Sequence, residues 1–297
     1  GSSGPLSMAR YTGPVVDAHH HLWDITTANI PWLEREPDLA RDCGTADYLA
    51  AAAPLDVVAT VWIEAVAADP LAEARAAAKR HAEDRRIAAA VVAHAPLDAP
   101  DLEDRLDRRV DAAPMLRSIR DIVAVRPGFP SFARRDDLLQ RPAFATGLRA
   151  LARRGLAFDL MLEPWQMDAA LKLASAIPDL QFIVEHAGSP DWSTGEGGRL
   201  WGEAMRAAAR LPNVAVKISA LHCRMPQWSD RALGAAIFDL ASWFGVARLA
   251  FASDFPVHDR TVPFARAYES FAAAVADLSA DEQRALFHDT ARRLYRM

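Results

Sequence analysis

The sequence is poor in cysteine, has no long apolar run and carries no excess of positive charge, and each absence excludes a class of protein. Cys43 and Cys223 are the only cysteines among 297 residues, and they form no CxxC motif. This usage is typical of a reduced, cytoplasmic setting. No stretch is apolar over the ~18 residues that a membrane span requires. The net charge of −5 provides no electrostatic footprint for nucleic acid.

The chain does contain enough apolar residues for a large core, with 51% hydrophobic and 25% charged residues. We interpret residues 1–13, GSSGPLSMARYTG, as a tag remnant and flexible N-terminus that lacks the apolar segment of a secretory signal. We expect residues 14–297 to form one domain, because they contain no internal repeat or low-complexity tract. A single α/β barrel often reaches this length.

Short apolar segments alternate along the chain with longer segments of helical periodicity. Several of the short segments, such as VVATVWI and IAAAVV, are apolar almost throughout, which is typical of parallel strands covered on both faces. We predict strands over Val15–His19, Val57–Ile63, Ile87–Val92, Met115–Arg120, Leu156–Met161, Gln181–His186, Val214–Ser219 and Leu249–Ser253. We predict helices over Pro70–Glu83, Asp101–Ala112, Pro142–Arg153, Met167–Ala176 and Leu200–Leu211.

The spacing of the predicted strand ends indicates a closed barrel. The ends run from His21 to Asp254 at intervals of about 33 residues, close to the ~30 residues of one βαβ unit. Eight such units favour a single (β/α)8 TIM barrel. An open doubly wound sheet is the alternative, but neither G-x-G-x-x-G nor G-x-x-x-x-G-K-S/T follows the first strand. The long connections 24–44 and 220–231 then lie on the catalytic face, where loops set substrate choice.

The first predicted strand ends in three consecutive histidines, within VVDAHHHLWD. Side chains alternate along a strand, so His19 and His21 share one face and His20 points to the other. Two imidazoles on one face at a strand end can chelate a divalent ion or bracket a polar substrate.

Polar residues also end the sixth and eighth predicted strands. His186 follows the apolar FIVE segment, and Asp254 follows LAFAS. A charged group beside an apolar strand is costly unless it is paired or binds something. Because strand ends meet on one face of a barrel, we predict that these two residues join His19 and His21 in one site.

The segments VVDAHHHLWD, SIRD, EHAGSPDW, NVAVKISAL, RLAFASDFPV and DTARRLYRM resemble successive motifs of the amidohydrolase-2 group of the amidohydrolase superfamily. The similarity extends over residues 14–297. This group includes lactonases for sugar acids (fuconolactonase and rhamnonolactonase) and for pyrone dicarboxylate, and is more distantly related to metal-dependent decarboxylases. The resemblance implies a distorted TIM barrel with its site at the carboxyl ends of the strands.

The resemblance also implies roles for individual residues. His19 and His21 match the family's H-x-H, His186 its sixth-strand histidine and Asp254 its catalytic aspartate. We take all four as candidate metal ligands, and Asp254 and His186 as candidate catalytic residues. Arg120 matches an arginine that contacts substrate in the lactonases. We add Glu64, Lys217, His94 and Trp165 as candidate substrate-binding residues at strand ends, and leave the roles of His222, Cys223 and His258 open.

Two departures from the family pattern bear on the chemistry. No lysine follows the fourth strand to bridge two metals, so a binuclear site is not expected. At the second strand, Glu64 stands where many relatives have glutamine, and it either alters the preferred substrate charge or pairs with Arg120.

Three imidazoles and a carboxylate suit one Zn²⁺. The same groups can instead bind a lactone carbonyl directly, and both alternatives stay open. No organic cofactor is expected.

The leading hypothesis is a hydrolase that opens a cyclic ester, a sugar-acid or related lactone, by Asp254-assisted attack of water. The alternatives are a zinc-dependent non-oxidative decarboxylase, a cyclic amide hydrolase and a barrel that binds ligand without catalysis. The expected partner is a small-molecule substrate, without nucleic acid or membrane, for a monomer or homodimer.

Overall fold

The computed structural model describes residues 10–297, so residues 1–9 of the predicted tag remnant lie outside it. Its central element is one sheet of eight parallel strands in the order β1 to β8, the chain order. The strands are β1 (Val15–His20), β2 (Val57–Ile63), β3 (Ala90–His94), β4 (Leu116–Arg120), β5 (Ala157–Leu160), β6 (Phe182–Val184), β7 (Val214–Ile218) and β8 (Leu249–Phe251).

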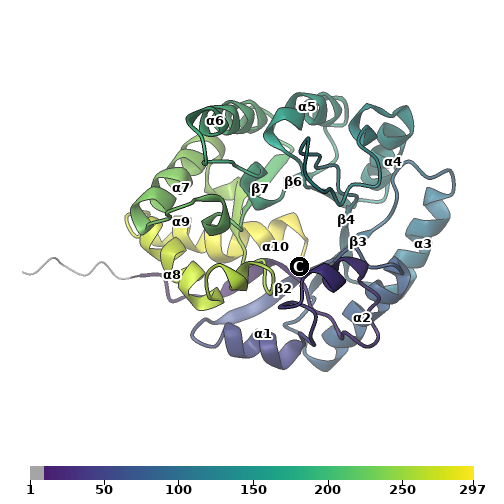
Figure 1. Ribbon diagram of the computed structural model, residues 1–297, viewed down its shortest axis with the longest axis horizontal. Helices are drawn as coiled ribbons and strands as arrows, with labels where there is room; N and C mark the ends of the chain where they lie inside the picture. Colours follow the sequence, from purple (N-terminus) through teal and green to yellow (C-terminus); the bar gives the residue numbers. More distant parts are fainter. Residues whose placement is uncertain (1–9) are drawn as a thin grey trace, which may run out of the picture.

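The sheet curves into a nearly closed barrel surrounded by helices (Figure 1). The first and last strands meet through residues that follow β8: Asp254 N donates to His19 O at 2.9 Å, and His21 N donates to Phe255 O at 2.7 Å. These bonds place the backbone of Asp254 next to that of His19. The predicted (β/α)8 TIM barrel is therefore confirmed.

Eight of the helices follow the strands in turn, as a (β/α)8 fold requires. They are α1 (Thr45–Ala51), α2 (Pro70–Glu83), α3 (Leu102–Ala112), α4 (Pro142–Arg153), α5 (Met167–Ala176), α6 (Gly195–Ala209), α7 (Asp230–Phe244) and α8 (Phe264–Ala274), followed by the short α9 (Ala280–Arg284) and α10 (Thr290–Leu294). The local sequence explains where several of these helices begin. Asp69 caps α2 by accepting from Ala72 N, and a proline occupies the first turn of α2 and α4. No helix of the described residues is both long and apolar enough to cross a membrane.

Several predicted boundaries are wrong, and three of them have a clear local cause or affect a site residue. The third strand begins at Ala90 rather than Ile87, because the turn after α2 continues through Ala88, whose φ is 53°. The sixth strand ends at Val184, and His186 lies in a following turn. Helix α6 begins at Gly195 rather than Leu200, because the Thr194 side chain accepts from Gly197 N and starts the helix within a glycine-rich segment.

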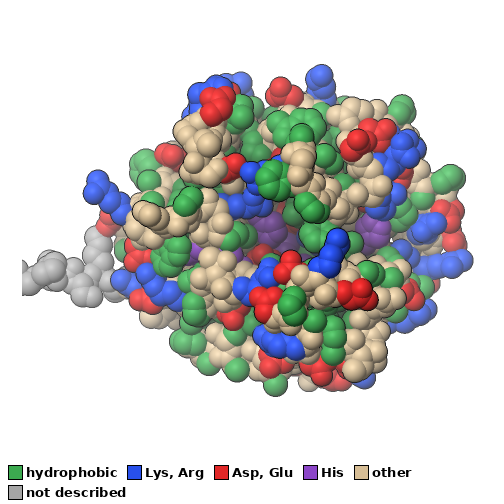
Figure 2. Space-filling view, viewed as in Figure 1, with side chains coloured by type: hydrophobic (Ala, Val, Ile, Leu, Met, Phe, Trp, Pro, Cys, Tyr) green, Lys and Arg blue, Asp and Glu red, His purple; other side chains and the backbone are tan. Residues whose placement is uncertain are grey.

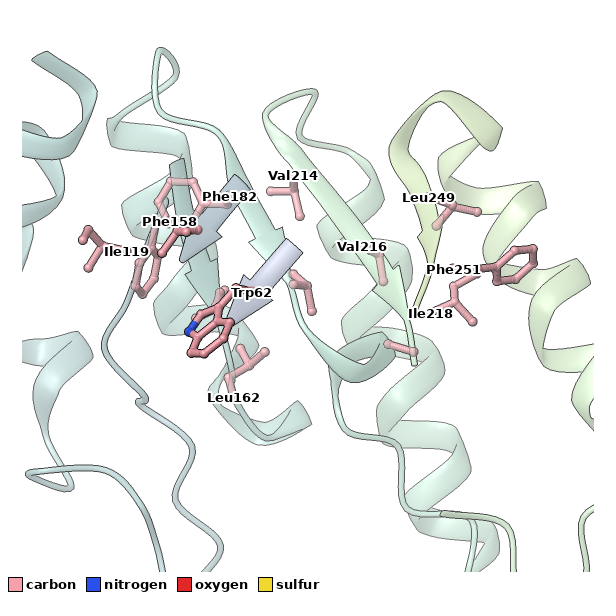
Figure 3. Close-up of a cluster of buried hydrophobic side chains, with 14 of the residues drawn as sticks. Trp62, Ile119, Phe158, Leu162, Phe182, Val214, Val216, Ile218, Leu249 and Phe251 are labelled. Atoms are coloured by element: carbon pink, nitrogen blue, oxygen red, sulfur yellow. The ribbon is translucent and has the colours of Figure 1, made fainter. Parts of the chain in front are cut away.

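Alternation along the strands sorts the core into two layers. Large apolar side chains such as Phe158, Phe182 and Phe251 point outward, where the helices cover them (Figure 3). Smaller ones, including Ala90 and Ala215, point into the barrel with Tyr295 of the C-terminal segment. This segment closes the end of the barrel where the strands begin. The opposite end, where the strands terminate, is left for polar groups.

Candidate active site

The three histidines of β1 separate as strand alternation predicts. The rings of His19 and His21 lie inside the barrel, edge to face, with centroids 5.1 Å apart. The ring of His20 lies on the outer face, where its Nε2 is 2.8 Å from Thr60 Oγ1 and its ring packs against Tyr48. Burial in this apolar layer lowers the pKa of His20 to about 3. His20 is therefore a neutral structural residue, and His19 and His21 remain for the site.

His186 and Asp254 reach the same place through strained backbone. Both residues have a φ of 52°, in the left-handed region that residues other than glycine rarely adopt. Hydrogen bonds hold both turns: Trp201 Nε1 donates to Ala187 O at 2.6 Å, and the Asp254 amide donates to His19 O. The His186 ring centroid lies 4.7 Å from that of His19. Strain of this kind persists where the surrounding structure fixes it, and it is concentrated at functional sites.

The carboxylate of Asp254 faces two imidazoles. Its Oδ1 is 3.5 Å from His19 Nε2 and 3.6 Å from His21 Nε2. Burial alone would raise the pKa of Asp254, but the neighbouring His186, His21 and His19 outweigh it and lower that pKa. Asp254 is therefore ionised at neutral pH. Burial lowers the pKa of His19 and of His186, so both imidazoles are neutral there.

Hydrogen bonding fixes the tautomer of His21. Its Nδ1 is 2.8 Å from the carbonyl oxygen of Ile63, which can only accept, so Nδ1 carries the proton. In the neutral ring, Nε2 then presents a lone pair toward Asp254 Oδ1. Two acceptors 3.6 Å apart repel each other unless a water molecule, a proton or a cation lies between them.

The tautomer of His19 follows from Lys217, which is buried inside the barrel. Lys217 Nζ lies 2.8 Å from His19 Nδ1, 2.7 Å from Asp159 Oδ2 and 3.4 Å from Glu185 Oε2. An ammonium has only donors, so Nδ1 of His19 accepts and the ring proton is on Nε2. That Nε2 is buried and has no hydrogen-bond partner among the described residues. It is a donor aimed toward the carboxylate of Asp254.

Arg120, which we predicted to contact substrate, lies within a buried ion network. Its Nε donates to Glu64 Oε1 at 2.7 Å, one terminal nitrogen to Glu64 O at 2.6 Å and the other to Glu185 Oε1 at 3.0 Å. Of the two alternatives for Glu64, pairing with Arg120 is the one observed. Burial opposes the charge of Arg120, but the two carboxylates outweigh it and raise its pKa.

Sequence reasoning missed Glu185 and Asp159. Glu185 lies between Arg120, Lys217 and His19, with its Oε2 3.3 Å from His19 Nδ1. Asp159 on β5 pairs with Lys217 and accepts from Tyr295, and burial raises its pKa to about 6. A signal was present, since both are charged residues within apolar strand segments.

An open cleft of about 700 Å³ lies beside this cluster. We call it the side cleft, and it is lined by Glu64, Val66, Ala67, Ala68, Pro70, His94, Pro96, Asp98, Ala99, Pro100, Arg105, Arg109, Asp121, Ile122, Phe132, Arg134 and Arg141. Its walls are the loops after β2, β3 and β4 and one face of α3, rather than the connections 24–44 and 220–231 that we singled out. The loop after β4 was not recognised from the sequence, although RPGFPS marks it. Histidine side chains are visible in the hollow at the centre of this face (Figure 2).

The remaining candidates lie around the same face. His94 lines the side cleft, and its Nδ1 donates to Arg120 O at 3.0 Å. Trp165 is 54% exposed, and its indole nitrogen donates to Val125 O, so it lies at the rim and does not line the side cleft. His222 and His258 are buried neighbours with ring centroids 5.2 Å apart. Desolvation raises the pKa of the Cys223 thiol, which opposes a nucleophilic role.

The site residues suit a divalent metal. Ligand atoms of His19, His21 and Asp254 lie within 4.8 Å of one another, and so do those of His19, Glu185 and His186. The facing acceptors of His21 and Asp254 are the arrangement that a cation stabilises. Glu185 is already occupied by Arg120 and Lys217, so the first set fits a metal better.

Known proteins resemble the chain along almost its whole length. The model of the family described as amidohydrolase matches residues 16–297. The chain is 32% identical to the uncharacterized protein y4mH of Sinorhizobium fredii, covering 95% of this chain and 98% of that one. It is 28% identical to an L-fucono-1,5-lactonase of Burkholderia ambifaria, covering 82% and 80% of the two chains. An amidohydrolase of Burkholderia multivorans, solved with bound zinc, superposes with a TM-score of 0.84 at 23% identity, covering 96% of this chain and all of that one.

Proposed function

The chain is a hydrolase of the amidohydrolase family, and from this premise we propose that it opens a cyclic ester, a sugar-acid or related lactone. The observation that carries the proposal is the pairing of an ionised Asp254 with the imidazoles of His19 and His21 at the carboxyl ends of the strands. The similarity to proteins named L-fucono-1,5-lactonase supports a lactone as substrate. We further propose a cytoplasmic enzyme, monomeric or homodimeric, that needs no organic cofactor.

In this proposal Asp254 is the general base. The 3.6 Å between Asp254 Oδ1 and His21 Nε2 supports the placement of a water molecule that donates one hydrogen to each of these atoms. Asp254 takes a proton from this water as it attacks the lactone carbonyl, and returns the proton to the ring oxygen that leaves. A positioned general base contributes a factor of ~10² to 10⁴ in rate.

His19 is the proposed donor to the developing oxyanion. Its Nε2 carries the ring proton because Lys217 donates to Nδ1, and it has no partner among the described residues. A buried donor that is already oriented stabilises the charge that develops on the carbonyl oxygen. His186, whose Nδ1 is 2.8 Å from Ser219 Oγ, is held beside it.

Zn²⁺, if bound, would be held by His19, His21 and Asp254, with His186 adjacent, and would supply Lewis-acid polarisation of the carbonyl. His19 would then present Nε2 to the ion without its proton, so the oxyanion-donor role of His19 belongs to the metal-free form of the site. The residue set supports one ion, because the carboxylates of the adjoining ion network, Glu64, Glu185 and Asp159, are each ion-paired. Three of the five N–H donors of Arg120 bond Glu64 and Glu185, so we propose that Arg120 positions Glu185 and the β4 end rather than holding the substrate.

The proposal is tested with a panel of lactones, cyclic amides and aromatic acids, each assayed with and without a chelator. We expect turnover of at least one lactone class and little turnover of the other two classes. Selective decarboxylation of an aromatic acid, or selective opening of a cyclic amide, would replace the lactonase assignment. Loss of lactone turnover with chelator, restored by zinc, would identify the metal-dependent form of the reaction.

A further inference from the structure

The side cleft combines an apolar wall with an unusual concentration of arginine. Phe132, Ile122, Pro96 and Pro100 are among its lining residues, together with four arginines. A volume of about 700 Å³ lies within the range of small-molecule pockets. The cleft shares Glu64 with the ion network that leads through Arg120 and Glu185 to His19.

Most of the charge in the cleft is neutralised by neighbouring groups. Arg134 lies 2.8 Å from an Asp121 oxygen and 2.6 Å from Asp98, and Arg141 lies 3.2 Å from the other oxygen of Asp98. These two carboxylates and two guanidinium groups therefore cancel. Glu64 is paired with Arg120 behind the cleft wall.

Arg105, the third arginine, pairs with Asp101 at 2.8 Å on the exposed side of α3. Arg109 is the exception. It is only 5% exposed, yet it has no carboxylate within 4 Å among residues 10–297. Its Nε donates to His94 O at 3.0 Å, and its two terminal nitrogens form no hydrogen bond with any described residue.

An arginine with this environment has either a packing role or a ligand-binding role. The bond to His94 O is enough to explain why Nε is buried and why the side chain follows β3. It leaves the four N–H donors of the terminal nitrogens, which are accessible from the side cleft and have no partner among the described residues. The parallel donors of a guanidinium match the two oxygens of a carboxylate.

We propose that the side cleft binds a free carboxylate of the substrate on the terminal nitrogens of Arg109. This inference rests on the proposed lactonase function and specifies the substrate as a lactone that carries one free carboxylate. The single unpaired positive charge sets the number of carboxylates, and the apolar wall around Phe132 accommodates a carbon skeleton. Glu64 and His94 line the cleft and both bond Arg120, which connects the cleft to the ion network beside His19.

Binding is tested with benzoate and benzamide, which have nearly the same shape and differ in charge, by isothermal titration calorimetry on the full chain. We expect benzoate to bind at least tenfold more tightly than benzamide. Arg109→Met should remove this preference, and the control Arg105→Met, which removes an already paired arginine of the same cleft, should retain it. Arg109→Lys keeps the positive charge but lacks the two parallel N–H donors of the guanidinium group, so it should retain a reduced preference for benzoate. Equal binding of the two probes by the wild type, or an unchanged preference in Arg109→Met, would overturn the proposal.

A kinetic experiment separates this proposal from the lactonase assignment. A lactone that bears a carboxylate is compared with its carboxamide, and we expect Arg109→Met to raise KM for the acid at least tenfold while changing KM for the amide little. If no lactone is hydrolysed but benzoate binding depends on Arg109, the lactonase proposal fails and the carboxylate site stands. If lactones are hydrolysed and Arg109→Met affects acid and amide equally, the carboxylate site fails alone.

Discussion

Lys217 Nζ lies 2.8 Å from Nδ1 of His19, inside the barrel and out of contact with solvent. The same ammonium bonds Asp159 and approaches Glu185, which it shares with Arg120. One lysine therefore both stabilises buried carboxylates and determines which nitrogen of His19 carries the proton. The stability of the barrel interior and the orientation of the catalytic donor therefore depend on the same residue.

Lys217→Met should be strongly destabilising. It leaves Asp159 without its cationic partner in a fully buried position, and breaking a buried pair on one side costs about 3–5 kcal/mol. Urea unfolding monitored by circular dichroism measures this change. The double variant Lys217→Met/Asp159→Asn should recover part of the loss, because no uncompensated charge then remains at Asp159. Simple additivity of the two single changes would show that the pair is not coupled.

Asp254→Asn should retain the fold and lose catalysis. The amide keeps the size of the side chain but cannot take a proton from water, so we expect kcat for the best lactone to fall about 10²- to 10⁴-fold. Steady-state kinetics and thermal unfolding of the same preparation measure both quantities. A kcat within a few-fold of the wild-type value would remove Asp254 from the mechanism.

Zinc affinity should distinguish the adjacent histidines of β1. We expect chelator-treated protein to bind one Zn²⁺ per chain, with His21→Gln weakening binding at least tenfold because it removes a ligand on the inner face. His20→Gln is the matched control, one residue away on the outer face, and should leave the affinity nearly unchanged. Calorimetric titration at neutral pH gives both constants. Equal weakening by the two changes would contradict a site built on His21.

The stability of the fold should fall in mild acid partly through His20. Burial lowers its pKa to about 3, whereas in the unfolded chain it is near 6.5, so between these values the unfolded state binds the extra proton. The stabilisation is complete above pH 6.5 and is lost as the pH falls toward 3. From pH 7.5 to pH 5, His20 alone should remove about 2 kcal/mol from the free energy of unfolding.

His20→Gln, which retains a hydrogen-bonding group near Thr60, provides the comparison for this pH dependence. Urea unfolding at the two pH values should show a loss that is smaller by about 2 kcal/mol in the variant than in the wild type. An identical pH dependence in both proteins would mean that His20 titrates alike in the folded and unfolded states.

Two helical glycines should respond in opposite directions to alanine. A Cβ at Gly147 in α4 would lie 2.0 Å from the carbonyl oxygen of Leu97, in the loop that lines the side cleft, so Gly147→Ala should destabilise by about 1–3 kcal/mol. At Gly234 in α7 the nearest atoms are 3.8 Å away, and alanine there should stabilise by about 0.5–1 kcal/mol. Thermal unfolding compares the stabilities of the two variants. An unchanged stability of Gly147→Ala would show that the loop containing Leu97 can move away from the new Cβ with little loss of stability.

The sequence by itself determined the features that depend on local periodicity. Strand alternation separated His20 from His19 and His21, and the regular spacing of apolar segments defined eight strands and the face on which their ends lie. His186 and Asp254 were recognisable because a polar residue at the end of an apolar strand requires a partner. Resemblance to the amidohydrolases added the roles of these residues.

Only the tertiary structure decided how the charges pair. Arg120 lies about as far along the chain from Glu64 as from Glu185, and nothing local indicates that it bonds both and has little capacity left for substrate. Lys217 reaches His19 because the barrel brings β7 and β1 to a common interior, a contact across 198 positions of the chain. Arg109 is distinguished from the other three arginines of the side cleft by its burial and by having no nearby carboxylate among residues 10–297. Electrostatic energy depends on distance in space and on burial, and in a closed barrel both are set by packing between segments far apart in the sequence.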